Sequence, residues 1–220
     1  MQIETFKGYE YAFSPNVGEA RLLCRYGGSG RFVWNKALSI QKEHLDKKEK
    51  FLTYKELCKL LTGWKEDSEM AWLNEAPAAA LQQKLKDLCN ALKRFRQRKA
   101  GFPKFKKRGK GDDDSFRIPS IKQFKLDQDK SWITLPKMNP MRYRNSRKFE
   151  GDIKNVTVKP KCGKFFFSVS VKEVVEISKH PSTSAVGVDW GCTKLATLSN
   201  GKMYDPVPDV SKYEKRIARL

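Results

Sequence analysis

Val186-Gly187-Val188-Asp189-Trp190-Gly191 is a short apolar stretch that ends in an acid and a glycine. The pattern predicts a short β-strand with a carboxylate at its end. Two further strands are predicted at residues 195–198 and 202–204, separated by the turn Ser199-Asn200-Gly201. We therefore expect an antiparallel meander that begins at Asp189.

The composition of the chain predicts a folded protein with a polyanionic partner. Of the 220 residues, 39% are hydrophobic, which can supply a core. Lys and Arg number 45 against 25 Asp and Glu, and the net charge of +20 exceeds what solubility requires. No segment approaches the roughly 18 apolar residues of a membrane-spanning helix, and no signal peptide is evident. The expected location is the cytoplasm, in association with the nucleoid.

The cysteines and histidines give no sign of a disulfide framework or a metal site. The five cysteines are widely spaced and contain no Cys-x-x-Cys pair, which argues against disulfides and zinc within this chain. We expect them to be reduced and mostly buried. His44 and His180 are too far apart in sequence to suggest a metal pair.

The first hundred residues combine one strand with several helices. Residues 1–13 alternate aromatic side chains and predict a strand, and Ser14-Pro15 predicts the start of a helix. Gly27-Gly28-Ser29-Gly30 then predicts a break, which would make a helix-loop-helix. The clearest helix has an apolar stripe that predicts a core-facing side, formed by Leu81, Leu85, Leu88, Leu92 and Phe95.

The other face and the end of this helix are basic, and no acid interrupts residues 88–111. Phe95, Phe102 and Phe105 interleave with the Lys and Arg side chains of this region. Aromatic rings can stack on bases while cations neutralise phosphates. Residues 93–110 therefore predict a nucleic-acid surface, whereas Lys47-Lys48 fit a solvated charge run equally well.

From Phe116 onward the pattern changes from helical to alternating. Strands are predicted at residues 132–135, 141–144, 153–158 and 164–172, the last with Phe165, Phe167, Val169 and Val171 on one face. Residues 159–163 predict the hairpin turn between the last two strands. A small antiparallel barrel that recruits the amino-terminal strand is the expected closure, followed by a linker at residues 173–184.

Asp189 is the candidate catalytic and metal-binding residue. In RNase H-like nucleases a first-strand carboxylate helps hold two Mg²⁺ ions that stabilise an in-line phosphodiester displacement. One carboxylate cannot do this alone, and Asp205, Asp209 and Glu214 are interpreted as turn, cap and surface acids. Two alternatives for Asp189 are a turn-forming acid and the phosphate-binding Asp-x-Gly of actin-like ATPases, which the basic composition disfavours.

The chain resembles TnpB-type transposon proteins, the OrfB-like transposase family of compact RNA-guided DNA nucleases related to type V CRISPR effectors. The resemblance covers nearly the whole chain. It is carried by segments in the family's order and spacing: Arg31-Phe32-Val33-Trp34-Asn35, Trp72-Leu73, Ala80-Leu81-Gln82, Gly101-Phe102-Pro103-Lys104-Phe105-Lys106, Val156-Thr157-Val158 and residues 186–191.

The resemblance implies an α+β fold with an antiparallel wedge β-barrel, an inserted α-helical recognition lobe and the first strands of an RNase H-like (RuvC) domain. Residues 1–14 and 101–180 would form the barrel, residues 15–100 the recognition lobe, and residues 181–220 the incomplete start of the nuclease. The implied partners are a guide RNA and target double-stranded DNA with a short flanking motif.

In this resemblance Tyr54 and Gln82 match positions that face the flanking motif, and Ala78 and Ala79 stand where larger side chains can contribute. The nucleic-acid-binding residues predicted from the basic run and the resemblance together are Arg31, Asn35, Tyr54, Gln82, Arg94, Arg98, Lys104, Phe105, Lys106, Lys107 and Arg108.

The family pattern continues through a second catalytic acid, a Cys-x-x-Cys zinc element and a third aspartate, none of which this sequence contains. Val210, Tyr213, Ile217 and Leu220 form an apolar helical stripe that reaches the last residue without a stop signal. The strand of Asp189 would also leave a hydrophobic edge that proteins normally cover. These features predict a chain truncated after the first RuvC motif.

The leading hypothesis is the amino-terminal part of a transposon-associated RNA-guided DNA endonuclease, inactive by itself. Mg²⁺ would serve the complete family protein and would not be stably bound by this chain. A full-length homologue or a missing carboxy-terminal part is a further expected partner. The alternatives are a naturally short, nuclease-dead RNA-guided DNA-binding repressor or accessory subunit, and a general basic RNA-binding protein.

Overall fold

The computed structural model describes residues 2–176, 182 and 184–206, which fall into two compact units. One unit comprises Gln2–Val175, and the other holds the described residues from Glu176 onward. The predictions that concern His180, Asp209, Glu214 and the apolar stripe at residues 210–220 lie outside the described residues.

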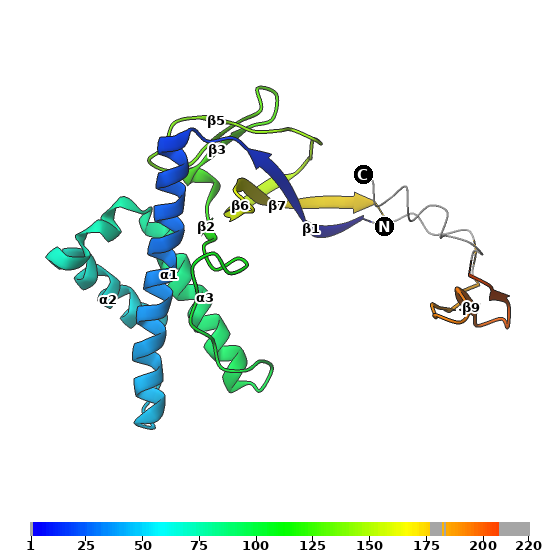
Figure 1. The fold of residues 1–220 in the computed structure, drawn as a ribbon, viewed down its shortest axis with the longest axis horizontal. Coiled ribbons are helices and arrows are strands. Elements are labelled where there is room, and N and C mark those ends of the chain that lie inside the picture. Colours follow the sequence, from blue (N-terminus) through cyan, green and yellow to red (C-terminus); the bar gives the residue numbers. More distant parts are fainter. Residues whose placement is uncertain (1, 177–181, 183, 207–220) are drawn as a thin grey trace. The chain divides into compact units, whose positions relative to one another are not determined.

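The larger unit contains a four-stranded sheet with the strand order β1-β7-β6-β2 (Figure 1). Its strands are β1 (Gln2–Phe13), β7 (Lys164–Glu176), β6 (Asp152–Lys161) and β2 (Phe116–Ile118). β6 and β7 form an antiparallel hairpin whose two turn residues, Cys162 and Gly163, have φ of 49° and 73°, as the favoured two-residue hairpin turns require. The predicted hairpin is confirmed, with a shorter turn than expected.

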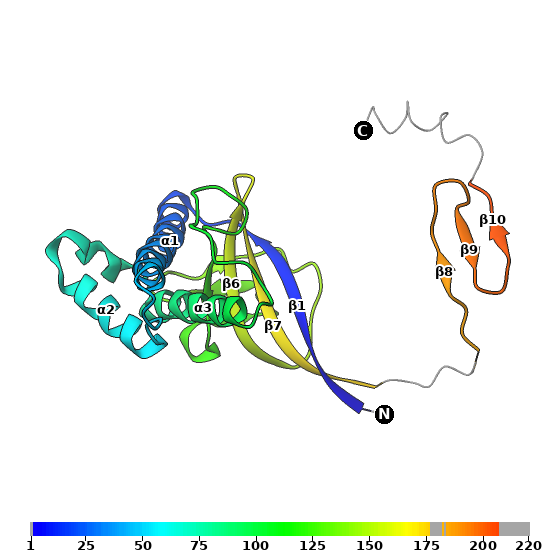
Figure 2. The same ribbon diagram turned by 90° about the horizontal axis from the view of Figure 1, so that it is seen from below.

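The amino-terminal strand joins this sheet through aromatic packing. Figure 2 shows β1 and β7 running in opposite directions. The ring centroids of Tyr11 and Phe13 lie 5.4 Å and 5.7 Å from that of Phe167, on the buried face of β7 that the alternation predicts. The Tyr11 hydroxyl donates to the Arg147 carbonyl oxygen over 2.8 Å. Recruitment of the amino-terminal strand is therefore confirmed.

A second sheet of the same unit consists of β3 (Lys125–Asp127), β4 (Trp132–Thr134) and β5 (Met141–Arg142) in that order, all antiparallel. It follows the short 3₁₀ helix η2 (Ile121–Gln123). An antiparallel bridge between Phe13 and Tyr143, with an Arg144 N to Ala12 O hydrogen bond of 2.9 Å, connects it to the end of β1. The two sheets are thus joined through β1.

The helices of this unit are α1 (Val17–Asp46), α2 (Tyr54–Glu66), the 3₁₀ helix η1 (Ser68–Glu75) and α3 (Ala78–Arg96). The predicted helix-loop-helix is wrong, because α1 continues through residues 27–30. Glycine in a helix costs about 1 kcal/mol relative to alanine, but here it permits close packing. A Cβ at Gly27 would lie 2.2 Å from the Asp114 carbonyl oxygen, and one at Gly30 would lie 3.2 Å from Lys84 Cε.

The start of α1 also differs from the prediction. The N-cap is Asn16, not Ser14-Pro15. Its side-chain oxygen accepts from Glu19 N over 2.9 Å, and Glu19 accepts from Asn16 N over 2.8 Å. This reciprocal capping box needs an acid three residues after the cap, and Glu19 supplies it.

The apolar stripe of α3 forms the helical core, as predicted. Leu81, Leu85, Leu88 and Leu92 are buried where α3 packs against α1, α2 and β2. Phe95 is half-buried, and its ring meets that of Phe102 edge to face at 5.2 Å. These two rings pack on each other, and their base-stacking role stays a prediction.

The smaller unit contains an antiparallel sheet of β8 (Val188–Asp189), β9 (Ala196–Leu198) and β10 (Met203–Tyr204), in the order β10-β9-β8. The predicted meander is confirmed. Val188 pairs with Leu198, and Met203 pairs with Thr197.

The cysteines are free, as expected, but they are not mostly buried. Cys24, Cys162 and Cys192 are exposed, because they lie on the outer side of α1, in the β6–β7 turn and in the loop after β8. None of the described helices is both long and apolar enough to cross a membrane.

Candidate nucleic-acid interface

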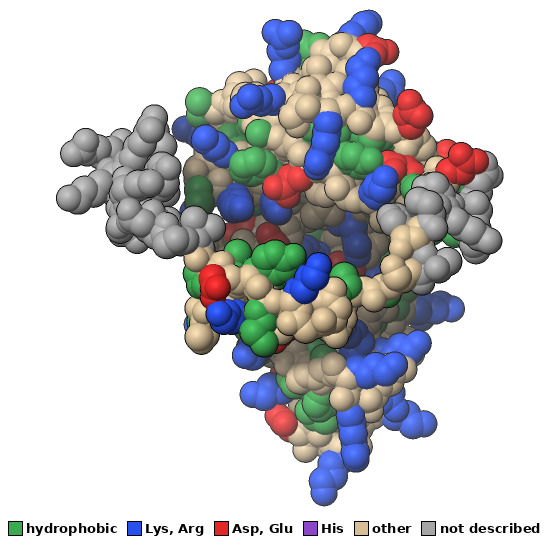
Figure 3. All heavy atoms as spheres, turned by 90° about the vertical axis from the view of Figure 1, so that its right-hand side faces the viewer, with side chains coloured by type: hydrophobic (Ala, Val, Ile, Leu, Met, Phe, Trp, Pro, Cys, Tyr) green, Lys and Arg blue, Asp and Glu red, His purple; other side chains and the backbone are tan. Residues whose placement is uncertain are grey.

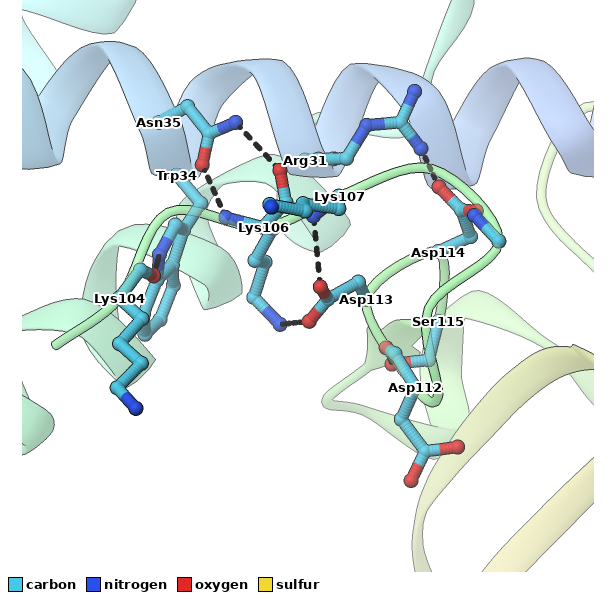
Figure 4. A network of polar contacts seen from close by, with 11 residues as sticks. Arg31, Trp34, Asn35, Lys104, Lys106, Lys107, Asp112, Asp113, Asp114 and Ser115 are labelled. Atoms are coloured by element: carbon cyan, nitrogen blue, oxygen red, sulfur yellow. Dashed lines mark hydrogen bonds and ion pairs between the residues drawn. The ribbon is translucent and has the colours of Figure 1, made fainter.

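Residues 104–115, here called the anchored loop, lie along one side of α1 (Figure 4). Trp34 Nε1 donates to the Lys104 carbonyl oxygen over 3.1 Å. The Asn35 side-chain amide pairs with the backbone of Lys106 in both directions: Nδ2 donates to its carbonyl over 3.0 Å, and Oδ1 accepts from its N–H over 2.8 Å. Two adjacent residues of α1 therefore fix the backbone of this loop.

Two aspartates complete the anchoring. Asp113 accepts from Lys106 Nζ over 3.2 Å and from the Lys107 backbone N–H over 2.8 Å. Burial opposes the charge of Asp113, but these two hydrogen bonds and the Lys106 charge together lower its pKa. Asp114 accepts from Gly109 N over 2.7 Å and forms an ion pair with Arg31 (Figure 4). The two aspartates near the end of the loop thus hold the backbone of its basic first half in place.

The outward side of the anchored loop and the end of α3 present cations to solvent. Lys104, Lys107 and Arg108 are exposed, and Phe105 is 49% exposed. In Figure 3, Lys and Arg side chains gather over the lower part of the face shown, where the ends of α1 and α3 lie in Figure 1. This surface can combine phosphate neutralisation with stacking on one exposed ring.

The end of α3 holds two of the predicted contact residues. Arg94 and Arg98 are both exposed. Arg98 has a φ of 54° and donates its N–H to Phe95 O over 2.9 Å, while Lys99 N–H donates to Arg94 O over 2.9 Å. This is a Schellman ending, in which glycine usually occupies the left-handed position. An arginine stands there instead and adds a cation six residues before the start of the anchored loop.

Three other predicted contact residues have their polar groups engaged within the protein. Arg31 pairs with Asp114, Asn35 holds the backbone of Lys106, and the Lys106 ammonium lies between Asp113 and the Trp34 ring, 4.9 Å from the ring centroid. Their contacts give them a structural role in shaping the loop. Direct contact between these residues and nucleic acid stays a prediction.

Tyr54 and Gln82 belong to the helices α2 and α3 and not to the anchored loop. Tyr54 begins α2 and lines a pocket of about 480 Å³ together with Cys89, Lys93 and Arg96 of α3. Burial and a hydrogen bond with Cys58 raise the pKa of Tyr54 to about 12. Gln82 is exposed on α3. Their role in reading a flanking motif stays a prediction.

Asp189 lies at the end of β8 and is exposed. Asp205 is held in an ion pair with Lys194. Within residues 2–176, 182 and 184–206, no three His, Cys, Asp or Glu side chains gather in a way that could hold a metal ion. The described residues therefore do not fit the two-metal arrangement, which several carboxylates must share.

The sequence reasoning missed residues that shape the interface from within. Trp34, Asp113 and Asp114 anchor the loop. For the two aspartates the available signal was the run Asp112-Asp113-Asp114 directly after a long basic segment. Lys84 lies on the helix whose outer face was expected to be basic, but it is only 7% exposed. Nothing in the sequence predicted that this lysine is buried, except that it lies next to the apolar stripe of α3.

Lys84 lies beneath the anchored loop, with its aliphatic chain against Gly30. Burial, followed by the charge of Lys106, lowers its pKa to about 8. The nearby acids serve other cations, since Asp87 pairs with Arg117 at 2.5 Å and Asp113 pairs with Lys106 at 3.2 Å. The folded protein therefore keeps a charged ammonium in a poorly solvated place at neutral pH.

Replacement of Lys84 by methionine is expected to raise the free energy of unfolding at pH 7 by up to about 3 kcal/mol, because burial lowers the pKa from 10.5 to about 8 and one pKa unit corresponds to about 1.4 kcal/mol. The folded state releases this proton near pH 8 and the unfolded state near pH 10.5. The cost of burying the charge is thus complete below pH 8 and disappears toward pH 10.5. Urea unfolding at several pH values measures this, with exposed Lys86→Met as the control. A less stable Lys84→Met protein at pH 7 would contradict it.

Comparison with known proteins connects this architecture to a family. Residues 1–50 match the helix-turn-helix domain model of the OrfB IS605 family. The described part of that range forms β1 and the single continuous helix α1. A chain in the cryo-EM structure of the Cas12f1-sgRNA-target DNA complex has a TM-score of 0.43 and 17% identity, over 98% of this chain and 60% of that one.

Two curated relatives match almost the whole chain. InsQ of Escherichia coli (strain K12), named as a candidate RNA-guided DNA endonuclease, is 42% identical over 218 residues, which cover 99% of this chain and 53% of the relative. A protein of Streptomyces pristinaespiralis with the same designation is 29% identical, over 98% of this chain and 52% of its own length.

The chain is therefore similar over nearly its whole length to proteins designated as candidate RNA-guided DNA endonucleases, and its first 50 residues match the OrfB IS605 helix-turn-helix model. It spans about half the length of the curated relatives it matches.

Proposed function

We propose that this chain binds a guide RNA and its target DNA as part of an RNA-guided DNA endonuclease. The observation that carries the proposal is the anchored loop. Internal hydrogen bonds from Trp34, Asn35 and Asp113 shape its backbone, and the side chains of Lys107 and Arg108 are left exposed. The designations of both curated relatives support RNA-guided DNA recognition.

We further propose that the two sheets of the larger unit form a wedge barrel and that the helices form a recognition lobe. The bridge between Phe13 and Tyr143, which joins the sheets through β1, supports a barrel. The β10-β9-β8 sheet would be the start of a RuvC-like nuclease domain. Its support is the antiparallel meander, in which Asp189 ends the first strand.

Asp189 would be one ligand of the Mg²⁺ site of such a nuclease, and the other carboxylates would have to come from elsewhere. We therefore expect the 220-residue chain to bind guided DNA without cutting it in the presence of Mg²⁺. A cleavage assay with a guide RNA and a matched duplex measures this. Cleavage that Asp189→Ala abolishes would overturn the proposal that further carboxylates are needed.

The RNA that co-purifies with the chain tests guided binding. Sequencing is expected to return one defined transcript from the end of the transposon, because a guided protein selects its guide. A mixture of abundant cellular RNAs would instead support general basic RNA binding. Binding of a duplex matched to the recovered guide, with a mismatched duplex as control, then separates guided recognition from charge attraction.

A further inference from the structure

A pocket of about 560 Å³ lies between α1 and η1, on residues that the proposed interface does not use except for Arg31. Its walls include Arg25, Gly28 and Phe32 from α1, and Trp72 and Glu75 from η1. The volume falls within the roughly 300–1,000 Å³ of sites for small molecules and cofactors. Both walls belong to the larger unit.

Gly28 is the part of this pocket that the packing of the protein leaves unexplained. Gly27 and Gly30 are required by close neighbours, but a Cβ at Gly28 would meet only Arg31 Nη2, at 3.9 Å. Alanine there would favour the helix by about 1 kcal/mol. The glycine thus leaves the pocket open at a cost in helix stability.

The aromatic wall suits a flat ligand. Trp72 is 43% exposed, and its ring meets Phe32 at a centroid distance of 5.1 Å and an interplanar angle of 67°. This edge-to-face contact holds the indole in place and leaves much of it accessible. Stacking of a base on an aromatic side chain contributes about 1–3 kcal/mol.

The polar wall selects among bases. Arg25 Nη1 donates to the two oxygens of Glu75 over 3.3 Å and 3.1 Å, and the side chains are 64% and 45% exposed. A carboxylate has about four acceptor positions, so two stay available. Guanine is the base whose pairing edge places two donors side by side, N1–H and N2–H, next to the acceptor O6. A carboxylate beside a guanidinium complements that edge.

We propose that this pocket takes one unpaired guanine of a bound single strand, stacked on Trp72 and recognised by Glu75 and Arg25. Arg31 forms its ion pair through Nη1, so its Nη2 beside Gly28 can meet the phosphate of the same nucleotide. The inference rests on the proposed nucleic-acid binding and adds a base preference to it.

Fluorescence anisotropy with uracil decamers, each carrying one central guanine, adenine or cytosine or none, tests this pocket in RNA and DNA forms. The guanine decamer is expected to bind about tenfold more tightly than the others, since a good bidentate contact contributes roughly 1–3 kcal/mol of discrimination. A guanine preference in both RNA and DNA would show that the pocket recognises the base itself. A guanine preference in RNA alone would show that the pocket binds RNA.

Gly28→Leu should fill the pocket and remove the preference for the guanine decamer over the all-uracil decamer. The matched control is Gly63→Leu, because Gly63 is also helical and faces open space. Glu75→Gln is a second variant that changes no volume and should remove the preference too. A guanine preference that survives both variants, or equal binding of all decamers, would overturn the proposed guanine pocket but leave the proposed nucleic-acid binding standing. Absence of binding to any strand overturns the proposed function as well.

Discussion

Replacement of Gly27 by alanine is expected to lower the free energy of unfolding by about 3 kcal/mol, near the upper end of the cost of overpacking. The added Cβ would lie 2.2 Å from the Asp114 carbonyl oxygen and 3.1 Å from its carbonyl carbon. A backbone carbonyl cannot rotate away as a side chain does. The anchored loop must therefore move off α1, which breaks the ion pair between Arg31 and Asp114.

Gly28→Ala is the matched control for this prediction. The added methyl group meets no backbone, so the helix should gain about 0.4–1 kcal/mol. Urea unfolding measures both variants, and limited trypsin digestion at the lysines of the anchored loop reports whether the loop has moved. Equal stability of the two alanine variants would show that the contact with Asp114 is not the reason for Gly27.

Reversal of two exposed cations on the anchored loop, Lys107→Glu with Arg108→Glu, is expected to weaken nucleic-acid binding by roughly 100-fold near 0.1 M salt. Each phosphate contact with duplex DNA contributes about 0.9 to the slope of log K against log salt, so that slope should fall by about two. The loop should keep its shape, because Asp113 bonds the backbone N–H of Lys107 and not its side chain.

The matched control is Lys122→Glu with Lys125→Glu, two exposed residues of η2 and β3 that change the net charge by the same amount. Titration of a labelled duplex and of the co-purified RNA at four salt concentrations gives both slopes. If the control weakens binding as much as the loop variant does, net charge and not the anchored loop explains the affinity.

The periodic parts of the fold could be predicted from the sequence. The stripe from Leu81 to Leu92 and the alternation of β7 depend on local spacing, and both became core surfaces. The predicted break at Gly27-Gly28-Ser29-Gly30 was wrong because the contacts that explain these glycines come from residues far away in the sequence. What keeps α1 continuous is the approach of Asp114 and Lys84, which are 87 and 54 residues away in sequence from Gly27 and Gly30.

The sequence could predict that the candidate interface is basic, but not which of its cations are exposed. A basic run indicates where cations concentrate, but it does not show which of them are paired internally. Lys106 and Lys107 are neighbours in sequence, yet the ammonium of one is held by Asp113 and the side chain of the other is exposed. The sequence pattern did not predict the roles of Asp113 and Asp114, since pairing across a loop leaves no periodic pattern.

The anchored loop has a kinetic consequence. Ordering a free backbone costs about 1–2 kcal/mol per residue, and a flexible basic segment would incur that cost each time it bound. Here folding itself orders the loop, through Trp34, Asn35 and the two aspartates. Nucleic acid thus meets preorganised cations, so loosening the loop should shorten the lifetime of the complex while the association rate changes little.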